Sequence, residues 1–205
     1  MRIILIAVFS YLYGAIPFAY LATRLLSGKK LTEEGTGNIS VTNAYKVGGF
    51  GAVIITLLGE ISKAALPIFA ARAVLGDDLF CMLLAAFSAL VGTCFSVFLR
   101  GRGGRGSTVA LWIILILSPL AGVILLAIAG ILAVLARTHI MIKKLLLICI
   151  PVVIYLVERD TVFTAFGVLA SLLFLLTGCV RKDDYAYYNV FQQRSGLNDA
   201  DSLHP

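Results

Sequence analysis

The chain has 205 residues, of which 60% are hydrophobic and only 14% are charged, and its mean hydropathy is +0.98. A soluble domain cannot bury that much apolar surface, because ordinary domains are about 45–50% apolar and about a quarter charged. The net charge of +6 would suggest a nucleic-acid partner in a soluble protein, but in a membrane protein it is typical of cytoplasmic loops that retain Lys and Arg, so we expect a polytopic membrane protein and no nucleic-acid partner.

Seven apolar runs predict an all-α integral membrane protein of about seven transmembrane helices, because a spanning helix needs about 20 largely apolar residues. In chain order the runs cover residues 3–26, 50–75, 79–99, 109–117, 120–136, 145–157 and 162–177. No small-residue cleavage signature follows the first run, so we expect a retained span and not a signal peptide. Ser118-Pro119 splits a run that would otherwise be about 42 Å long, well over the roughly 30 Å hydrocarbon core, into two antiparallel segments.

The distribution of basic residues predicts the orientation. With the N-terminus outside and the C-terminus in the cytoplasm, the cytoplasmic segments are the loops 27–47, 100–106 and 137–144 and the tail 178–205. Together with Arg24, these segments hold 13 of the 17 Lys and Arg residues, which is the bias that the positive-inside rule describes. None of them is long enough to fold alone, so we expect one polytopic domain over residues 1–205.

No pattern in the sequence indicates a cofactor or a metal site. The four cysteines form no C-x-x-C pair, so we interpret them as packing residues. The two histidines, His139 and His204, have no Cys or carboxylate at ligand spacing and no adjacent nucleophile. We therefore expect no cofactor and no metal.

The first predicted cytoplasmic loop contains EEGTGNISVTNAYKVGG, residues 33–49. Its glycines allow a close approach of the backbone to a ligand, and its hydroxyl, amide and ammonium groups suit the hydroxyls and the phosphate of a polyol phosphate. The candidate substrate-binding residues are Thr36, Gly37, Asn38, Thr42, Asn43 and Lys46. A polar connecting loop favours the same residue types, so this alternative stays open.

The second predicted loop reads LRGRGGRGST, residues 99–108. It is too short and too tightly held between apolar runs for an RNA-binding RGG tract, and it lacks the Lys of a Walker A loop. Glycines that expose backbone amides, next to arginines and a helix start, indicate an anion site. The candidates are Arg102, Gly103, Gly104, Arg105, Gly106 and Ser107. A basic anchor that contacts lipid phosphates is the alternative.

Glu60 and Lys63 are two charges, at positions i and i+3, inside the second predicted span. Charged side chains within a membrane are costly and usually face the interior of the bundle or a polar cavity. Two interpretations stay open: an ion pair that holds helices in register, or a Lys63 that lines the floor of a cavity open to the cytoplasm.

The segments SYLYGAIPFAYL, GTGNISVTNAYKVGG, GEISKAALP and VGTCFSVFLRGRGGRGST, in this order, resemble the PlsY-type acyl-phosphate:glycerol-3-phosphate acyltransferases of bacteria. The resemblance covers residues 10–110 well and the rest mainly by hydropathy. It implies a multi-pass enzyme of the bacterial inner membrane, surrounded by membrane lipids, whose active site faces the cytoplasm. The implied reaction moves an acyl group from acyl-phosphate to the sn-1 hydroxyl of glycerol 3-phosphate, giving lysophosphatidic acid in phospholipid biosynthesis.

The same resemblance implies catalytic roles for Lys63 and Arg105, and it adds Asn189 to the substrate-binding residues. The sequence also departs from the family pattern. Thr93 stands where the family has His and Ser96 where it has Pro, and in the third motif Ala186 and Asn198 replace a His and a Glu. Two other functions therefore stay open: a non-catalytic relative that binds lipid or polyol phosphates, and a small anion transporter.

Overall fold

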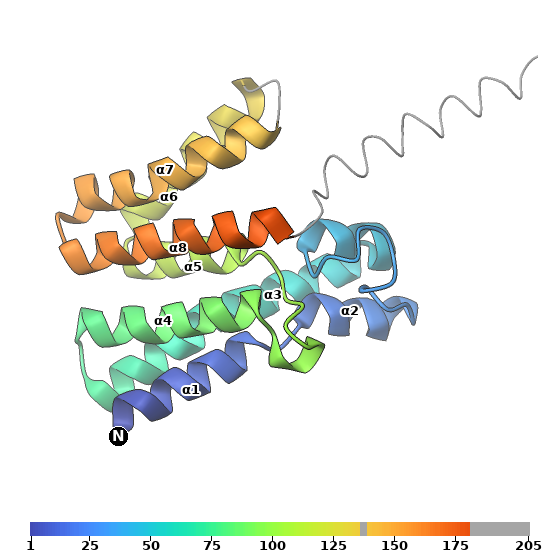
Figure 1. Ribbon diagram of the computed structural model, residues 1–205, viewed down its shortest axis with the longest axis horizontal. Coiled ribbons are helices and arrows are strands. Elements are labelled where there is room, and N and C mark those ends of the chain that lie inside the picture. Colours follow the sequence, from blue (N-terminus) through green and yellow to red (C-terminus); the bar gives the residue numbers. More distant parts are fainter. Residues whose placement is uncertain (136–138, 181–205) are drawn as a thin grey trace, which may run out of the picture.

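The computed structural model describes residues 1–135 and 139–180, and the side chains of 1–132 and 147–178. The described chain is all helical (Figure 1). Its elements are α1 (Arg2–Gly14), α2 (Phe18–Ser27), α3 (Val41–Leu75), α4 (Leu79–Cys94), the short 3-10 helix η1 (Val97–Leu99), α5 (Ser107–Leu117), α6 (Pro119–Leu135), α7 (His139–Glu158) and α8 (Thr161–Val180).

The predicted fold class is confirmed. Four helical segments are long and apolar enough to cross a membrane: Arg2–Ser27, Val41–Leu75, Leu79–Leu99 and Thr161–Gly178. Three shorter apolar helices correspond to the remaining predicted runs: Ser107–Leu117, Pro119–Leu132 and Leu147–Glu158. Large apolar side chains are exposed along these helices, as expected where lipid, and not water, is the solvent.

The first predicted span is broken where one continuous helix was expected. Helix α1 ends at Gly14 and α2 begins at Phe18. Pro17 causes this break, because proline has no backbone N–H and its ring collides with the preceding turn. The Phe18 amide then donates to the Ile16 carbonyl, at 3.1 Å, instead of to the Gly14 carbonyl. The break therefore leaves the carbonyls of Gly14 and Ala15 without their helical donors.

Two helix starts also differ from the predicted loop ends. Helix α3 begins at Val41, inside the predicted loop 27–47, because the Ser40 hydroxyl caps it by accepting from the Asn43 amide at 3.1 Å. A kink at Gly49, with φ of 74°, separates this N-terminal extension from the predicted span. Helix α7 begins at His139, so most of the predicted loop 137–144 is helical.

Small residues allow the first and fourth helices to pack backbone against backbone. A Cβ atom on Gly14 would lie 2.1 Å from the Ala89 carbonyl oxygen, and one on Gly92 would lie 2.1 Å from that of Tyr11.

Helix α8 lies between the α6–α7 pair and α4, and α2 packs on α3 (Figure 1). The predicted turn at Ser118 is present, and the Ser118 hydroxyl contacts Glu158 at the end of α7. The 28–40 and 95–106 loops lie at the same end of the bundle (Figure 1).

Candidate functional site

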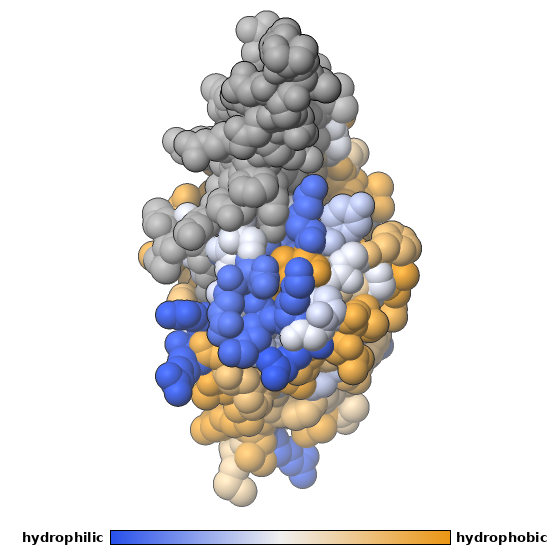
Figure 2. Space-filling model, turned by 90° about the vertical axis from the view of Figure 1, so that its right-hand side faces the viewer, coloured by the Kyte–Doolittle hydropathy of each residue, from blue (hydrophilic) through white to orange (hydrophobic). Residues whose placement is uncertain are grey.

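The two predicted loops lie against each other at one end of the helix bundle. A Cβ atom added to Gly104 would be 2.7 Å from the Ile39 carbonyl oxygen. A cleft of about 470 Å³ is lined by residues of both loops: Thr32, Glu33, Phe98, Leu99, Arg100 and Arg102. This end of the molecule carries a hydrophilic patch between apolar flanks (Figure 2). The chain thus brings together two loops that the sequence indicated separately.

Asn43 organises the first loop from its buried position at the start of α3. Its side-chain amide lies within hydrogen-bonding distance of three backbone carbonyls, those of Leu31 (3.3 Å), Glu34 (3.2 Å) and Asn38 (3.0 Å). Its side-chain oxygen accepts from the Thr36 amide at 3.3 Å. Because buried polar groups need such partners, these contacts fix the conformation of the loop around Asn43.

The other candidates of the first loop sit on this Asn43 framework. Gly37 has φ of 73°, a conformation that strains residues with a side chain, and its amide donates to the Glu34 carbonyl at 3.0 Å. The Thr36 hydroxyl accepts from the Asn38 amide at 3.3 Å. Thr42 is half-buried, and Lys46 is exposed with its ammonium 6.0 Å from the Tyr45 ring centroid. Thr36 is buried, so the groups that remain at least partly exposed are the Asn38 amide, the Thr42 hydroxyl and the Lys46 ammonium.

The second loop folds back onto the end of α4. A Cβ atom on Gly103 would lie 2.1 Å from the Thr93 carbonyl oxygen, so only glycine fits there without moving the backbone. The same carbonyl accepts from the Gly104 amide at 2.8 Å, and the Cys94 thiol donates to the Arg105 carbonyl at 3.3 Å. Gly106, with φ of 78°, is the residue before α5.

The start of α5 adds an electrostatic feature to the second loop. The first amides of a helix have no partner within it and carry a partial positive charge, which favours an anion. Helix α5 begins at Ser107, which is exposed, and no side chain caps it within the described residues. Arg102 is exposed and Arg105 is half-buried on the same loop. Amides and guanidinium groups therefore occupy one short stretch, as an anion site requires.

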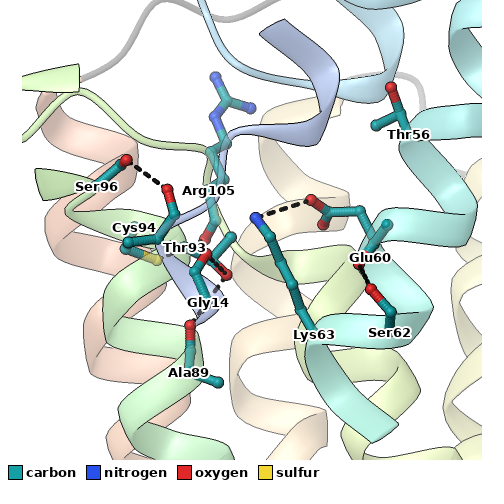
Figure 3. A network of polar contacts seen from close by, with 12 residues as sticks. Gly14, Thr56, Glu60, Ser62, Lys63, Ala89, Thr93, Cys94, Ser96 and Arg105 are labelled. Carbon is teal, nitrogen blue, oxygen red and sulfur yellow. Dashed lines mark hydrogen bonds and ion pairs between the residues drawn. The ribbon is translucent and has the colours of Figure 1, made fainter. Parts of the chain in front are cut away.

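Lys63 and Glu60 form a buried ion pair on α3. Their nearest charged atoms are 3.7 Å apart, and the Lys63 side chain is 3% exposed. The Lys63 ammonium lies 5.6 Å from the centroid of the Phe18 ring, which comes from the first turn of α2. Figure 3 shows this pair on α3 opposite Thr93, Cys94 and Arg105. In this view Lys63 faces the end of α4 and Arg105, and both interpretations of the pair stay open.

Two positions make contacts that the sequence interpretation missed. Thr93 and Ser96 were noted there only as substitutions in the family pattern. In the structure both are buried, and their hydroxyls hydrogen-bond carbonyls at the break of the first span, as Figure 3 shows for Thr93. The only signal in the sequence was Pro17, which predicts unpaired carbonyls before it but not their partners.

Asn189, Ala186 and Asn198 lie outside the described residues. Among the described side chains, those of residues 1–132 and 147–178, no three His, Cys, Asp or Glu gather as a metal site would require. The absence of a metal and a cofactor therefore stays a prediction for the whole chain.

The chain is similar to proteins of known families over most of its length. Residues 4–182 match the family described as glycerol-3-phosphate acyltransferase. A glycerol-3-phosphate acyltransferase of Syntrophotalea carbinolica is 34% identical over 166 residues, which are 80% of this chain and 84% of that protein. One of Jannaschia is 33% identical over 171 residues, 83% of each chain.

Solved structures extend the comparison to the fold. The crystal structure of PlsY (YgiH), an integral membrane glycerol 3-phosphate acyltransferase, in its glycerol 3-phosphate form has a TM-score of 0.76 and 18% identity, and the match covers 96% of this chain and 94% of that one. The lysophosphatidic acid form of the same protein gives a TM-score of 0.74. At this identity the likeness concerns the helical arrangement alone.

Proposed function

This chain belongs to the glycerol-3-phosphate acyltransferase family, and on that premise we propose that it transfers a fatty acyl group from acyl-phosphate to glycerol 3-phosphate. In this reaction the sn-1 hydroxyl oxygen forms a bond to the acyl carbon, and the bond between that carbon and the phosphate oxygen breaks. The hydroxyl proton leaves with the phosphate, so the products are lysophosphatidic acid and inorganic phosphate. Acyl-phosphate carries a good leaving group, so the reaction needs no protein nucleophile.

The observation that carries this proposal is the contact between the two loops. One loop offers hydroxyl, amide and ammonium groups, the other offers arginines and the first amides of α5, and Gly104 of the second loop packs against Ile39 of the first. A transfer between two phosphate-bearing substrates requires two such sites side by side. Holding both reactants in place, with positive groups at the phosphates, supplies much of the barrier reduction.

We assign the acyl-phosphate to the second loop. Its phosphate would lie at the start of α5, with Arg105 and Arg102 neutralising the charge. Glycerol 3-phosphate would lie on the first loop, where Lys46 meets the phosphate and Thr36, Asn38 and Thr42 meet hydroxyls. Lys63 forms the floor between the two sites, as its position opposite the second loop favours (Figure 3). Gly37 and Asn43 contribute through the conformation of the first loop.

The distribution of basic residues supports a cytoplasmic position for this site. Both loops carry Lys and Arg, which cytoplasmic loops retain. We therefore place the protein in the bacterial inner membrane with the site open to the cytoplasm, where a water-soluble polyol phosphate reaches it. The acyl chain would stay among the helices.

A non-catalytic relative that binds phosphates is the second candidate, because Thr93 stands where the resemblance implies a His and its hydroxyl already binds backbone carbonyls. The test uses purified full-length protein with acyl-phosphate and radiolabelled glycerol 3-phosphate, and it measures labelled lysophosphatidic acid. We expect product that depends on both substrates. Binding of both substrates without product would favour the second candidate.

Arg105→Ala tests the assignment of the second loop. Loss of one preorganised charge at a reacting phosphate typically lowers kcat about 10²–10³-fold, and we expect a loss of that size in the initial-rate assay. The matched control is Arg72→Ala at the far end of α3, where Arg72 is exposed and pairs with Asp77. Unchanged kinetics for Arg105→Ala would favour the lipid-anchor interpretation of this loop.

A further inference from the structure

Thr93 and Ser96 connect the end of α4 to the break in the first span. The Ser96 hydroxyl donates to the Ala15 carbonyl at 2.5 Å. The Thr93 hydroxyl lies 3.1 Å from the Gly14 carbonyl and 3.0 Å from that of Ala89, in its own helix. Among the described residues, these hydroxyls donate to the two carbonyls that the break leaves without helical donors. Both side chains are buried, at 4% and 1% exposure, where an unpaired carbonyl would be costly.

The same two residues hold the second loop through their own carbonyls. The Thr93 carbonyl accepts from the Gly104 amide at 2.8 Å, and the Ser96 carbonyl accepts from the Gly101 amide at 2.8 Å. Each residue therefore has its side chain bonded to the broken helix and its backbone bonded to the glycine loop. A third hydrogen bond also joins the first span to this region, since the Tyr11 hydroxyl of α1 donates to the Phe95 carbonyl at 3.0 Å.

The break also fixes the position of Lys63. Phe18, the first residue of α2, packs against Gly59 so closely that a Cβ atom there would lie 2.2 Å from its ring. The Phe18 ring is 5.6 Å from the Lys63 ammonium. The short segment from Gly14 to Phe18 is thus linked on one side to the glycine loop and on the other to the buried lysine.

We propose that Thr93 and Ser96 are positioning residues that hold the glycine loop 101–106 in the arrangement that binds the donor phosphate. They act through the carbonyls of Gly14 and Ala15 and touch no substrate. A hydroxyl bonded to two carbonyls has its proton engaged, so Thr93 serves neither as an acid nor as a base. This inference rests on the proposed function, because it assigns the donor phosphate to this loop.

The experiment compares Thr93→Val, which keeps the shape of the side chain and removes its hydroxyl, with Thr23→Val. Thr23 is equally buried, and its hydroxyl donates to the Ala19 carbonyl within its own helix, at 2.8 Å. Initial rates are measured with each substrate varied in turn. We expect Thr93→Val to raise the KM for acyl-phosphate about tenfold, the effect of losing a buried hydrogen bond. The KM for glycerol 3-phosphate should change less than about twofold, and Thr93→Ser, which restores the hydroxyl, should restore the KM for acyl-phosphate.

Ser96→Ala should behave in the same way, with Ser88→Ala as its control, because the Ser88 hydroxyl donates within α4 to the Leu84 carbonyl at 2.8 Å. Melting temperatures of all variants in detergent separate a positioning effect from a loss of fold. Equal changes in both KM values, or changes no larger than those of Thr23→Val, would overturn the proposal. A failure of Thr93→Ser to recover would also overturn it.

Binding of inorganic phosphate, measured by calorimetry, gives a second readout that does not depend on turnover. We expect Thr93→Val to weaken phosphate binding about tenfold and Thr93→Ser to preserve it. This pattern without lysophosphatidic acid formation by the unaltered protein would refute the enzyme function and support the positioning role. Equal phosphate affinity in Thr93→Val and the unaltered protein, or no binding by either, would refute the positioning role.

Discussion

At the scale of single residues, the pair Glu60 and Lys63 offers the sharpest distinction between a structural and a catalytic role. The two charges are buried together, 3.7 Å apart, and removing one partner of such a pair typically costs about 3–5 kcal/mol, because the other charge stays buried and unpaired. We expect Glu60→Gln to lower the melting temperature in detergent by several degrees. A melting temperature equal to that of the unaltered protein would contradict the pairing.

The double variant Glu60→Leu, Lys63→Met then separates the two roles. Replacing both charges by apolar side chains of similar size is often neutral for stability, so the melting temperature should recover. Activity should not recover, since we place Lys63 between the two substrates. A stable and fully active double variant would show that the pair serves helix packing and not catalysis.

Individual residues also show where sequence interpretation stops. The composition of the first loop indicated a set of polar candidates, but it treated Asn43 and Thr42 alike. The structure separates them, since the Asn43 side chain is fully buried and bonded to the loop backbone. Thr93 and Ser96 bond carbonyls 79 and 81 positions away. Composition and spacing carry no information about such distant backbone partners.

At the scale of elements, the close packing of α1 on α4 leads to a stability prediction. A Cβ atom at position 92 would lie 2.1 Å from the Tyr11 carbonyl oxygen and 2.9 Å from the Ala15 amide nitrogen. Both are backbone atoms, so no side-chain rotation can relieve the clash. Gly92→Ala should therefore destabilise by about 1–3 kcal/mol and lower the melting temperature by about 5 °C. Gly130→Ala is the control, because a Cβ atom there meets nothing within 4 Å. Equal melting temperatures for the two variants would contradict this packing.

The elements themselves were largely predictable, because lipid solvation requires long apolar runs that are visible in composition. The break at Pro17 was not predicted, since apolar and aromatic residues on both sides keep the hydropathy high across it. The early start of α3 was missed for the opposite reason. Its first turns are polar, and only the cap at Ser40 and the kink at Gly49 give them a helical conformation next to the site.

At the scale of the whole molecule, orientation is the main prediction. The basic segments predict a C-terminus in the cytoplasm and a turn between α7 and α8 on the outside. A green fluorescent protein fused after residue 205 should fluoresce, and alkaline phosphatase at the same place should be inactive. Fusions after Arg159, in that turn, should give the reverse pattern. The opposite result would place both loops of the proposed site on the outer face.

The length of α5 has a consequence for how strongly its N-terminus attracts a phosphate. Eleven residues make a helix about 16 Å long, roughly half of a hydrocarbon core, and the Ser118 hydroxyl that follows its last turn contacts Glu158, beside the exposed Arg159. Measured from that end, the amides that open α5 lie only about halfway across a hydrocarbon core. The donor phosphate that we propose to bind there would be reached from the cytoplasm through the loop 101–106 and would lie between apolar helices, where attraction to the helix dipole is stronger than in water and dissolved salt screens it less.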